Sequence, residues 1–66
     1  MYQRIRVIMT QEGMGALRRR PNFGYIISKK GDFVYILEDG KKAINRFSKN
    51  FWKPYHAEES YDYENV

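Results

Sequence analysis

The sequence predicts an all-β fold, a small barrel of five antiparallel strands with one short helical turn. Several short runs of the 66 residues alternate apolar and polar side chains, which is the pattern of half-buried strands. One such run, residues 33–38, leads into Asp39-Gly40, and an Asp-Gly pair between strands is a strong hairpin signal. Closing such short strands into a barrel gives them one shared core and few open edges.

The first strand is expected at residues 3–9, where the odd-numbered apolar residues share one face. The alternation stops in residues 10–22. A helix over residues 14–20 is conceivable, but two glycines and Pro21 interrupt this stretch. We therefore predict a long loop between the first and second strands.

The second strand is expected at residues 23–28, where Gly24 marks a bulge or a close backbone approach. A turn over residues 29–32 leads to the third strand, which is the run described above. After a tight two-residue hairpin at Asp39-Gly40, residues 41–46 are expected to return as the fourth strand.

Residues 47–51 are expected to form a tight helical turn with Ser48 as its cap. Residues 52–55 form a short last strand, which Pro54 confines to a sheet edge or a strand end. The predicted core collects the inward-facing apolar residues Ile5, Val7, Leu17, Ile26, Val34, Ile36, Ile44 and Phe51.

Composition limits the functions that are expected. The chain has no cysteine and one histidine, His56, so we predict no disulfide, no metal site and no cofactor. The absence of cysteine also fits a reducing setting, so a cytoplasmic location is expected. No apolar run approaches the roughly 20 residues of a membrane span, so no span is expected. No spacing brings a base, a nucleophile and an orienting acid together, so the protein is not expected to be an enzyme.

Charge divides the chain into two parts. Residues 1–56 are predicted to form the barrel domain, and residues 57–66 a disordered acidic tail. The tail holds four acids and no base, so the barrel has 12 bases against four acids, a net +8 where the whole chain has +4. Such a body attracts polyanions, most commonly nucleic acid, although a basic surface also serves solubility alone.

Short motifs in the chain resemble those of Src-homology-3-like small barrels, including the KOW modules of ribosomal and transcription proteins. The matching segments are Gly24-Tyr25-Ile26, Val34-Tyr35-Ile36, Asp39-Gly40 and the turn before Trp52. A closer resemblance, to small uncharacterised bacteriophage proteins, rests on Gly13, Arg18–Arg20, Gly24–Ile27, Asp39–Lys42 and Asn50-Phe51. It implies a phage or prophage protein in the cytoplasm of a bacterial host, and a binding module more than an enzyme.

Binding is expected through a basic loop and an aromatic face. Arg18, Arg19 and Arg20 lie in the predicted loop, where guanidiniums can pair with phosphates. Tyr25 and Tyr35 should lie on the outward face of adjacent strands, where with Phe33, Phe23 or Trp52 nearby they form a platform on which bases stack. The basic residues predicted to flank this platform are Lys41, Lys42, Arg46 and Lys53.

The sequence leaves several interpretations open. Aromatic residues also stabilise a small sheet by pairing across strands. The preferred function is binding of nucleic acid, DNA or RNA, and the alternative is a phage-type accessory protein that binds a host or virion protein. A homo-oligomer is a third interpretation. The acidic tail either aids solubility or mimics nucleic acid by folding back on the basic face.

Overall fold

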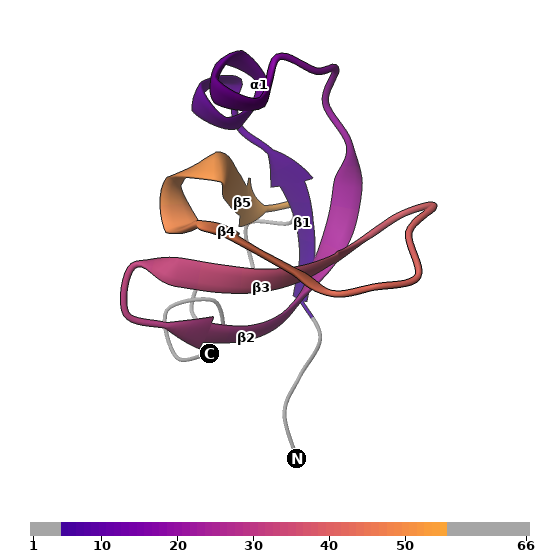
Figure 1. The fold of residues 1–66 in the computed structure, drawn as a ribbon, viewed down its shortest axis with the longest axis vertical. Coiled ribbons are helices and arrows are strands. Elements are labelled where there is room, and N and C mark those ends of the chain that lie inside the picture. Colours follow the sequence, from indigo (N-terminus) through magenta and orange to yellow (C-terminus); the bar gives the residue numbers. More distant parts are fainter. Residues whose placement is uncertain (1–4, 56–66) are drawn as a thin grey trace.

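A computed structural model of the protein describes residues 5–55 (Figure 1). Five antiparallel strands form one sheet in the order β4-β3-β2-β1-β5, and the sheet curls into a half-barrel. The elements are β1 (Ile5–Met9), α1 (Gln11–Leu17), β2 (Phe23–Lys30), β3 (Phe33–Glu38), β4 (Asn45–Ser48), the 3-10 turn η1 (Lys49–Phe51) and β5 (Trp52–Pro54). The prediction of a mostly β fold with five antiparallel strands is confirmed, and the predicted tail lies outside the described residues.

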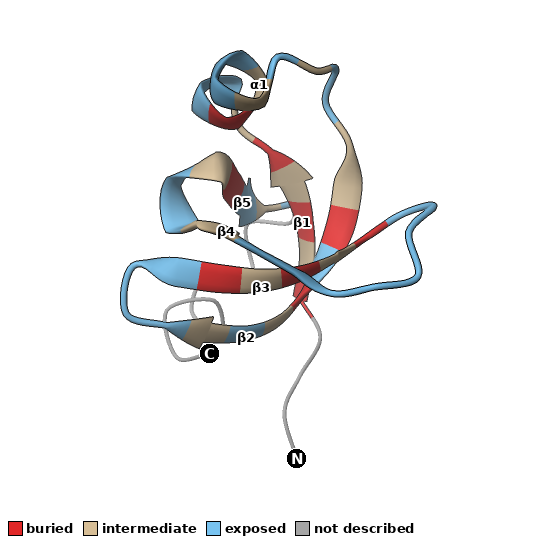
Figure 2. Ribbon diagram, in the orientation of Figure 1, coloured by how far each residue is buried: buried red, intermediate tan, exposed pale blue. Residues whose placement is uncertain are grey.

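The core lies inside the curl of the sheet, where alternate residues of the strands are buried (Figure 2). Within residues 5–55 the buried apolar side chains are Ile5, Val7, Met9, Ile26, Val34, Ile36 and Trp52. Leu17 and Phe51, also predicted for the core, pack half-buried at its margin. The prediction that Ile44 joins the core is wrong, because Ile44 precedes β4 in an unpaired segment and is 50% exposed.

The prediction of a long loop after β1 is also wrong, because this segment contains the helix α1. Thr10 caps the helix, and its hydroxyl accepts a hydrogen bond from the Gly13 backbone N–H at 3.1 Å. Gly13 lies against η1, where an added Cβ would be 2.7 Å from the Phe51 carbonyl oxygen. Arg18 ends the helix with a left-handed φ of 55°. Close packing on η1 thus outweighs the low helix propensity of glycine.

β3 ends in a turn, but not in the predicted two-residue hairpin. Gly40 adopts a φ of 85°, whereas Asp39 does not share this positive φ. A two-residue type I′ turn needs positive φ at both central positions. Strand pairing therefore resumes only between Ile36 and Asn45. Residues 41–44, predicted as the start of the fourth strand, are an exposed loop.

The last elements agree with the predictions. η1 is the predicted helical turn, and the Ser48 hydroxyl accepts a hydrogen bond from the Asn50 backbone N–H at 3.4 Å. Among the described strands β5 pairs only with β1, so it forms one edge of the sheet. Pro54, which has no backbone N–H to donate, fits such an edge.

β2 contains the irregularity that Gly24 predicted. Gly24 lies close to β3, where an added Cβ would be 2.9 Å from the Leu37 carbonyl oxygen, so the close backbone approach is confirmed. A bulge follows further along the strand, where the register with β3 shifts between Ile26 and Ser28. The bulge changes which residues of β2 and β3 face each other beyond this point.

Candidate functional site

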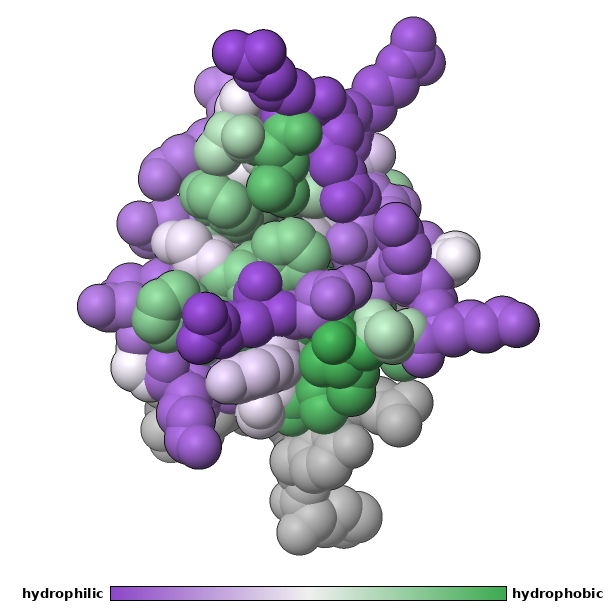
Figure 3. Space-filling model, viewed as in Figure 1, coloured by the Kyte–Doolittle hydropathy of each residue, from purple (hydrophilic) through white to green (hydrophobic). Residues whose placement is uncertain are grey.

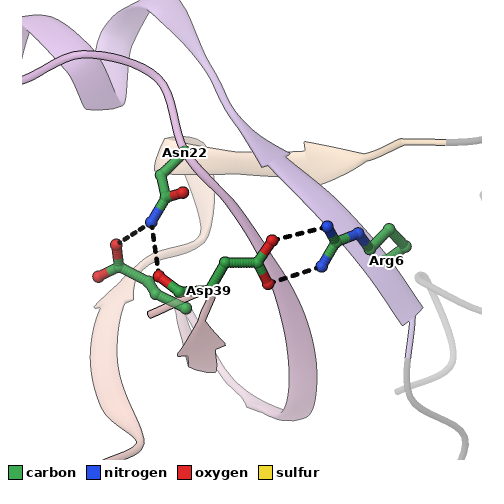
Figure 4. Close-up of polar contacts among 4 residues, drawn as sticks. Arg6, Asn22 and Asp39 are labelled. Atoms are coloured by element: carbon green, nitrogen blue, oxygen red, sulfur yellow. Dashed lines mark hydrogen bonds and ion pairs between the residues drawn. The ribbon is translucent and has the colours of Figure 1, made fainter. Parts of the chain in front are cut away.

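Two consecutive acids, Glu38 and Asp39, organise the surface where β3 ends, and each binds an arginine. Glu38 is 3% exposed, whereas the Asp39 side chain is open to water. Because successive side chains of a strand point to opposite faces, one acid is buried and the next is exposed. Figure 4 shows the Asp39 carboxylate directed toward Arg6, and its backbone carbonyl toward Asn22.

Glu38 is held by two residues of the segment between α1 and β2. Arg19 donates from Nη2 to Oε1 and from Nη1 to Oε2, and Asn22 Nδ2 donates to Oε1 at 3.0 Å. Burial by itself would raise the pKa of Glu38, but these hydrogen bonds and the charges of Arg19 and Lys41 outweigh burial and lower it. The carboxylate is therefore ionised at neutral pH, and the Arg19–Glu38 pair is a structural contact.

The contacts of Glu38 bring two basic segments together. Asn22 Nδ2 also donates to the Asp39 carbonyl at 3.3 Å, so the loop after α1 is tied to the turn after β3 (Figure 4). Arg19 pairs with Glu38, so only Arg18 and Arg20 of the three predicted loop arginines are exposed, and the turn that this segment contacts leads into the exposed Lys41 and Lys42. These four residues, Arg18, Arg20, Lys41 and Lys42, are named the basic corner.

Asp39 binds Arg6 on the outward face of β1. Its carboxylate accepts hydrogen bonds from both Nη atoms of Arg6, at 2.8 and 2.7 Å, and these bonds lower the pKa of Asp39. The guanidinium carbon lies 5.1 Å from the ring centroid of Phe23 and 4.7 Å from that of Tyr25. Tyr55 meets Phe23 edge to face at 5.1 Å. Arg6, Phe23, Tyr25 and Tyr55 are named the arginine–aromatic cluster.

Tyr35 and Arg46 belong to a second group on the outward face. Tyr25 and Tyr35 lie on neighbouring strands, as predicted, but Tyr25 pairs across the sheet with Leu37. Tyr35 pairs with Arg46 of β4, whose guanidinium carbon lies 4.5 Å from the ring centroid of Phe33. The two tyrosines are therefore offset along the sheet and do not form one continuous platform.

The remaining two predicted site residues, Lys53 and Trp52, differ in exposure. Lys53 is exposed on β5 and pairs with Ile8 of β1. Trp52 is 2% exposed and packs on Phe47, with ring centroids 5.5 Å apart. It pairs with Met9, which faces inward, and directly paired residues of antiparallel strands share a face. The prediction that Trp52 contributes to a binding surface is therefore wrong.

Sequence reasoning missed three residues of this surface, namely Arg6, Asp39 and Tyr55. The alternation of β1 places Arg6 opposite to its buried neighbours, so its outward position was available as a signal. Asp39 was assigned only to the turn, and Tyr55 only to the last strand. Their contacts join positions far apart in the chain, which no local pattern reports.

Comparisons with protein-family models, with curated proteins and with solved structures find no match to this chain. Within residues 5–55 no three histidine, cysteine or acidic side chains are grouped so that they could hold a metal ion. A search of the same part of the chain finds no helix with the length and apolar character of a membrane span.

Proposed function

We propose that this protein binds single-stranded nucleic acid, without catalysis, through the arginine–aromatic cluster and the basic corner. The observation that carries the proposal is that both groups lie at the end of β3. Asp39 binds Arg6 of the cluster, and Glu38 binds Arg19 and Asn22 of the segment that carries Arg18 and Arg20. Tyr25 and Tyr55 are 39% and 50% exposed, and the guanidinium carbon of Arg6 lies 4.7 Å from the ring centroid of Tyr25. Single strands need both features, since bases stack on rings and phosphates pair with cations.

The charge of the described residues supports the same partner. Residues 5–55 hold eleven lysines and arginines against four acids, a net +7. The resulting positive field attracts phosphates, and the binding that it gives is sensitive to salt because counterions are released. Stacking on aromatic rings is worth about 1–3 kcal/mol per base and tolerates any base. We therefore expect little sequence specificity.

The proposal includes the finer fold class, a Src-homology-3-like barrel. Its support is the strand order, in which β1 lies between β2 and β5, and the 3-10 turn that leads into β5. Proteins of this class are mainly binding modules, which agrees with a function without catalysis. The bacteriophage origin and the cytoplasmic location stay predictions.

Titration of fluorescently labelled oligonucleotides, followed by anisotropy, tests this function. Single-stranded and duplex forms of DNA and RNA are compared at two salt concentrations. We expect micromolar binding to single strands that weakens as the salt concentration rises, as is typical of phosphate contacts. Absence of binding at the lower salt concentration would contradict the proposed function.

A double variant, Arg18→Ala with Arg20→Ala, locates the site. It removes two exposed cations of the basic corner and leaves the ion pair between Arg19 and the buried Glu38 intact. We expect roughly tenfold weaker binding and a salt dependence that is shallower by about two ions. The control, Lys29→Ala with Lys30→Ala, removes the same charge at the other end of β2 and should bind nearly as the wild type does.

A second candidate function is binding to an acidic protein. Figure 3 shows apolar side chains gathered beside α1 and bordered by hydrophilic ones. The half-buried apolar residues that pack against the core are Met14, Leu17, Phe47 and Phe51. Aromatic anchors within a polar rim are typical of protein interfaces. A phage-type accessory protein would use such a surface on a host or virion protein, and its binding would depend less on salt than phosphate contacts do.

A further inference from the structure

The Arg6–Asp39 pair lies in the part of the arginine–aromatic cluster that a nucleic acid would meet. A guanidinium offers a planar fork of N–H donors, and a carboxylate and a phosphate both fit this fork with two hydrogen bonds. Here both Nη atoms donate to the Asp39 carboxylate. We infer that Arg6 is a phosphate-binding site that Asp39 occupies until nucleic acid binds, an inference that rests on the proposed function.

Exposure makes this pair exchangeable. The Arg6 and Asp39 side chains are 28% and 45% exposed, so water and dissolved salt screen their attraction. When the carboxylate leaves the guanidinium, water can hydrate it. The buried carboxylate of Glu38 has no such alternative, because it would lose its hydrogen bonds from Arg19 and Asn22 inside the fold.

The aromatic rings keep the guanidinium in position during this exchange. Arg6 lies over Phe23 and Tyr25, and these contacts do not involve Asp39. A guanidinium that is already oriented loses less conformational freedom when a phosphate binds to it. Bases that stack on the exposed rings of Tyr25 or Tyr55 bring their phosphates to the same cluster.

Asp39 is therefore an internal competitor of the ligand. It satisfies the donors of Arg6 in the free protein, and its negative charge opposes any phosphate that approaches the cluster. The wild-type protein should consequently bind polyanions less tightly than its positive charges allow. Removal of the Asp39 charge should strengthen binding, and the gain should depend on the position of that charge.

The test compares Asp39→Asn with Asp32→Asn in titrations of labelled oligo(dT). Both variants raise the net charge by one and remove an acid from an exposed ion pair. Asp32 pairs with Lys49 at 3.5 Å beside the β2–β3 turn, at the opposite end of β3 from Asp39. We expect Asp39→Asn to bind about fivefold more tightly, with a salt dependence steeper by about one ion. Asp32→Asn should change the affinity by less than about twofold.

A second measurement does not depend on nucleic acid. Inorganic phosphate is titrated into nitrogen-15-labelled protein, and the NMR signal of the Arg6 side-chain N–H is followed. In Asp39→Asn this signal should shift at a lower phosphate concentration than in the wild type. In Asp32→Asn it should respond as in the wild type, because Arg6 is still paired.

The other outcomes either overturn the inference or separate it from the proposed function. Equal tightening in both asparagine variants would overturn the inference, since the gain would then reflect net charge alone. Unchanged or weaker binding by Asp39→Asn would also overturn it, because Asp39 would then position Arg6 for the ligand. If no variant binds oligonucleotide, the proposed function fails and the phosphate titration decides on Arg6, with a shift supporting the anion site and no shift rejecting it.

Discussion

Glu38 and Asp39 are neighbours in the chain and each binds one arginine, but the two ion pairs differ in burial and in position. In the Arg19–Glu38 pair the carboxylate is buried, and the pair ties the loop after α1 to the end of β3. The Arg6–Asp39 pair lies on the outward face against two aromatic rings, and its carboxylate is exposed. Loss of Arg19 would leave the Glu38 carboxylate with little water to replace its partner, whereas water can replace Arg6 at Asp39. Burial therefore decides which pair is structural and which can exchange its anion.

The largest effect is expected for Arg19→Ala, which removes the charged partner of the buried Glu38 carboxylate. The Glu38 carboxylate would keep its hydrogen bond from Asn22 but lose its charged partner. Removing one partner of a buried ion pair typically costs several kcal/mol, and we expect a loss of about 3 kcal/mol in the free energy of unfolding. Urea denaturation monitored by Trp52 fluorescence measures this loss. The pKa of Glu38 should rise in the variant, because burial would then outweigh the remaining hydrogen bond.

The matched control for this prediction is Arg20→Ala. Arg20 directly follows Arg19 in the same loop and is exposed. Its loss should therefore change the free energy of unfolding by less than about 0.5 kcal/mol. If Arg19→Ala proves as mild as Arg20→Ala, the Arg19–Glu38 pair is not structural. The comparison of the two acids would then fail.

A smaller effect is expected for Gly13→Ala, which tests the other contact that fixes α1 to the barrel. The added methyl group would lie 2.7 Å from the Phe51 carbonyl oxygen and 3.0 Å from Met9 Cγ. We expect this overpacking to cost about 1–3 kcal/mol, more than alanine gains in helix propensity. Gly15→Ala, in the same helix but with nothing within 4 Å, should instead stabilise the protein by about 0.5–1 kcal/mol. Thermal unfolding followed by circular dichroism compares the two variants, and equal shifts would contradict the contact with η1.

The strands could be predicted from the sequence because burial imposes a period of two on them. The alternation in β1 and β3 identified their buried faces, since a strand with one face in a core must repeat every second residue. The helix α1 could not be predicted, because Gly13 is explained by its contact with η1, which is far away in the chain. Local propensity predicted a loop for this segment, whereas tertiary packing stabilises a helix.

The candidate site was predicted less well, for reasons of register. Trp52 belongs to a strand that is too short for the alternation of inward and outward residues to be recognised. Its pairing with Met9 shows that it faces inward. The register of β2 with β3 places Tyr25 opposite Leu37, so Tyr25 and Tyr35 are offset along the sheet, and the bulge then places Tyr35 opposite Ser28. The ion pair of Arg19 removed one of three apparently equivalent arginines from the basic surface. These properties follow from pairings between distant segments.

The smallest effect is expected from acid, and it distinguishes the two carboxylates directly. The pKa of each is lowered in the folded protein, from ordinary values of 4.5 for Glu38 and 3.8 for Asp39. Each carboxylate therefore contributes stability at pH values above its ordinary pKa. This contribution is lost as the pH falls through the lowered pKa. The free energy of unfolding of the wild type should be constant near neutral pH and should fall in the acid range below those values.

Burial again predicts which carboxylate matters more for this loss. In Glu38→Gln the acid-induced fall in the free energy of unfolding should be clearly smaller than in the wild type, because a buried ionised group has been removed. In Asp39→Asn the fall should be nearly unchanged, because water and salt screen the exposed pair. Urea midpoints measured at a series of pH values compare the three proteins. An equal reduction in both variants would show that exposure does not separate the two pairs, and Asp39 would then be held too firmly to yield Arg6 to a phosphate.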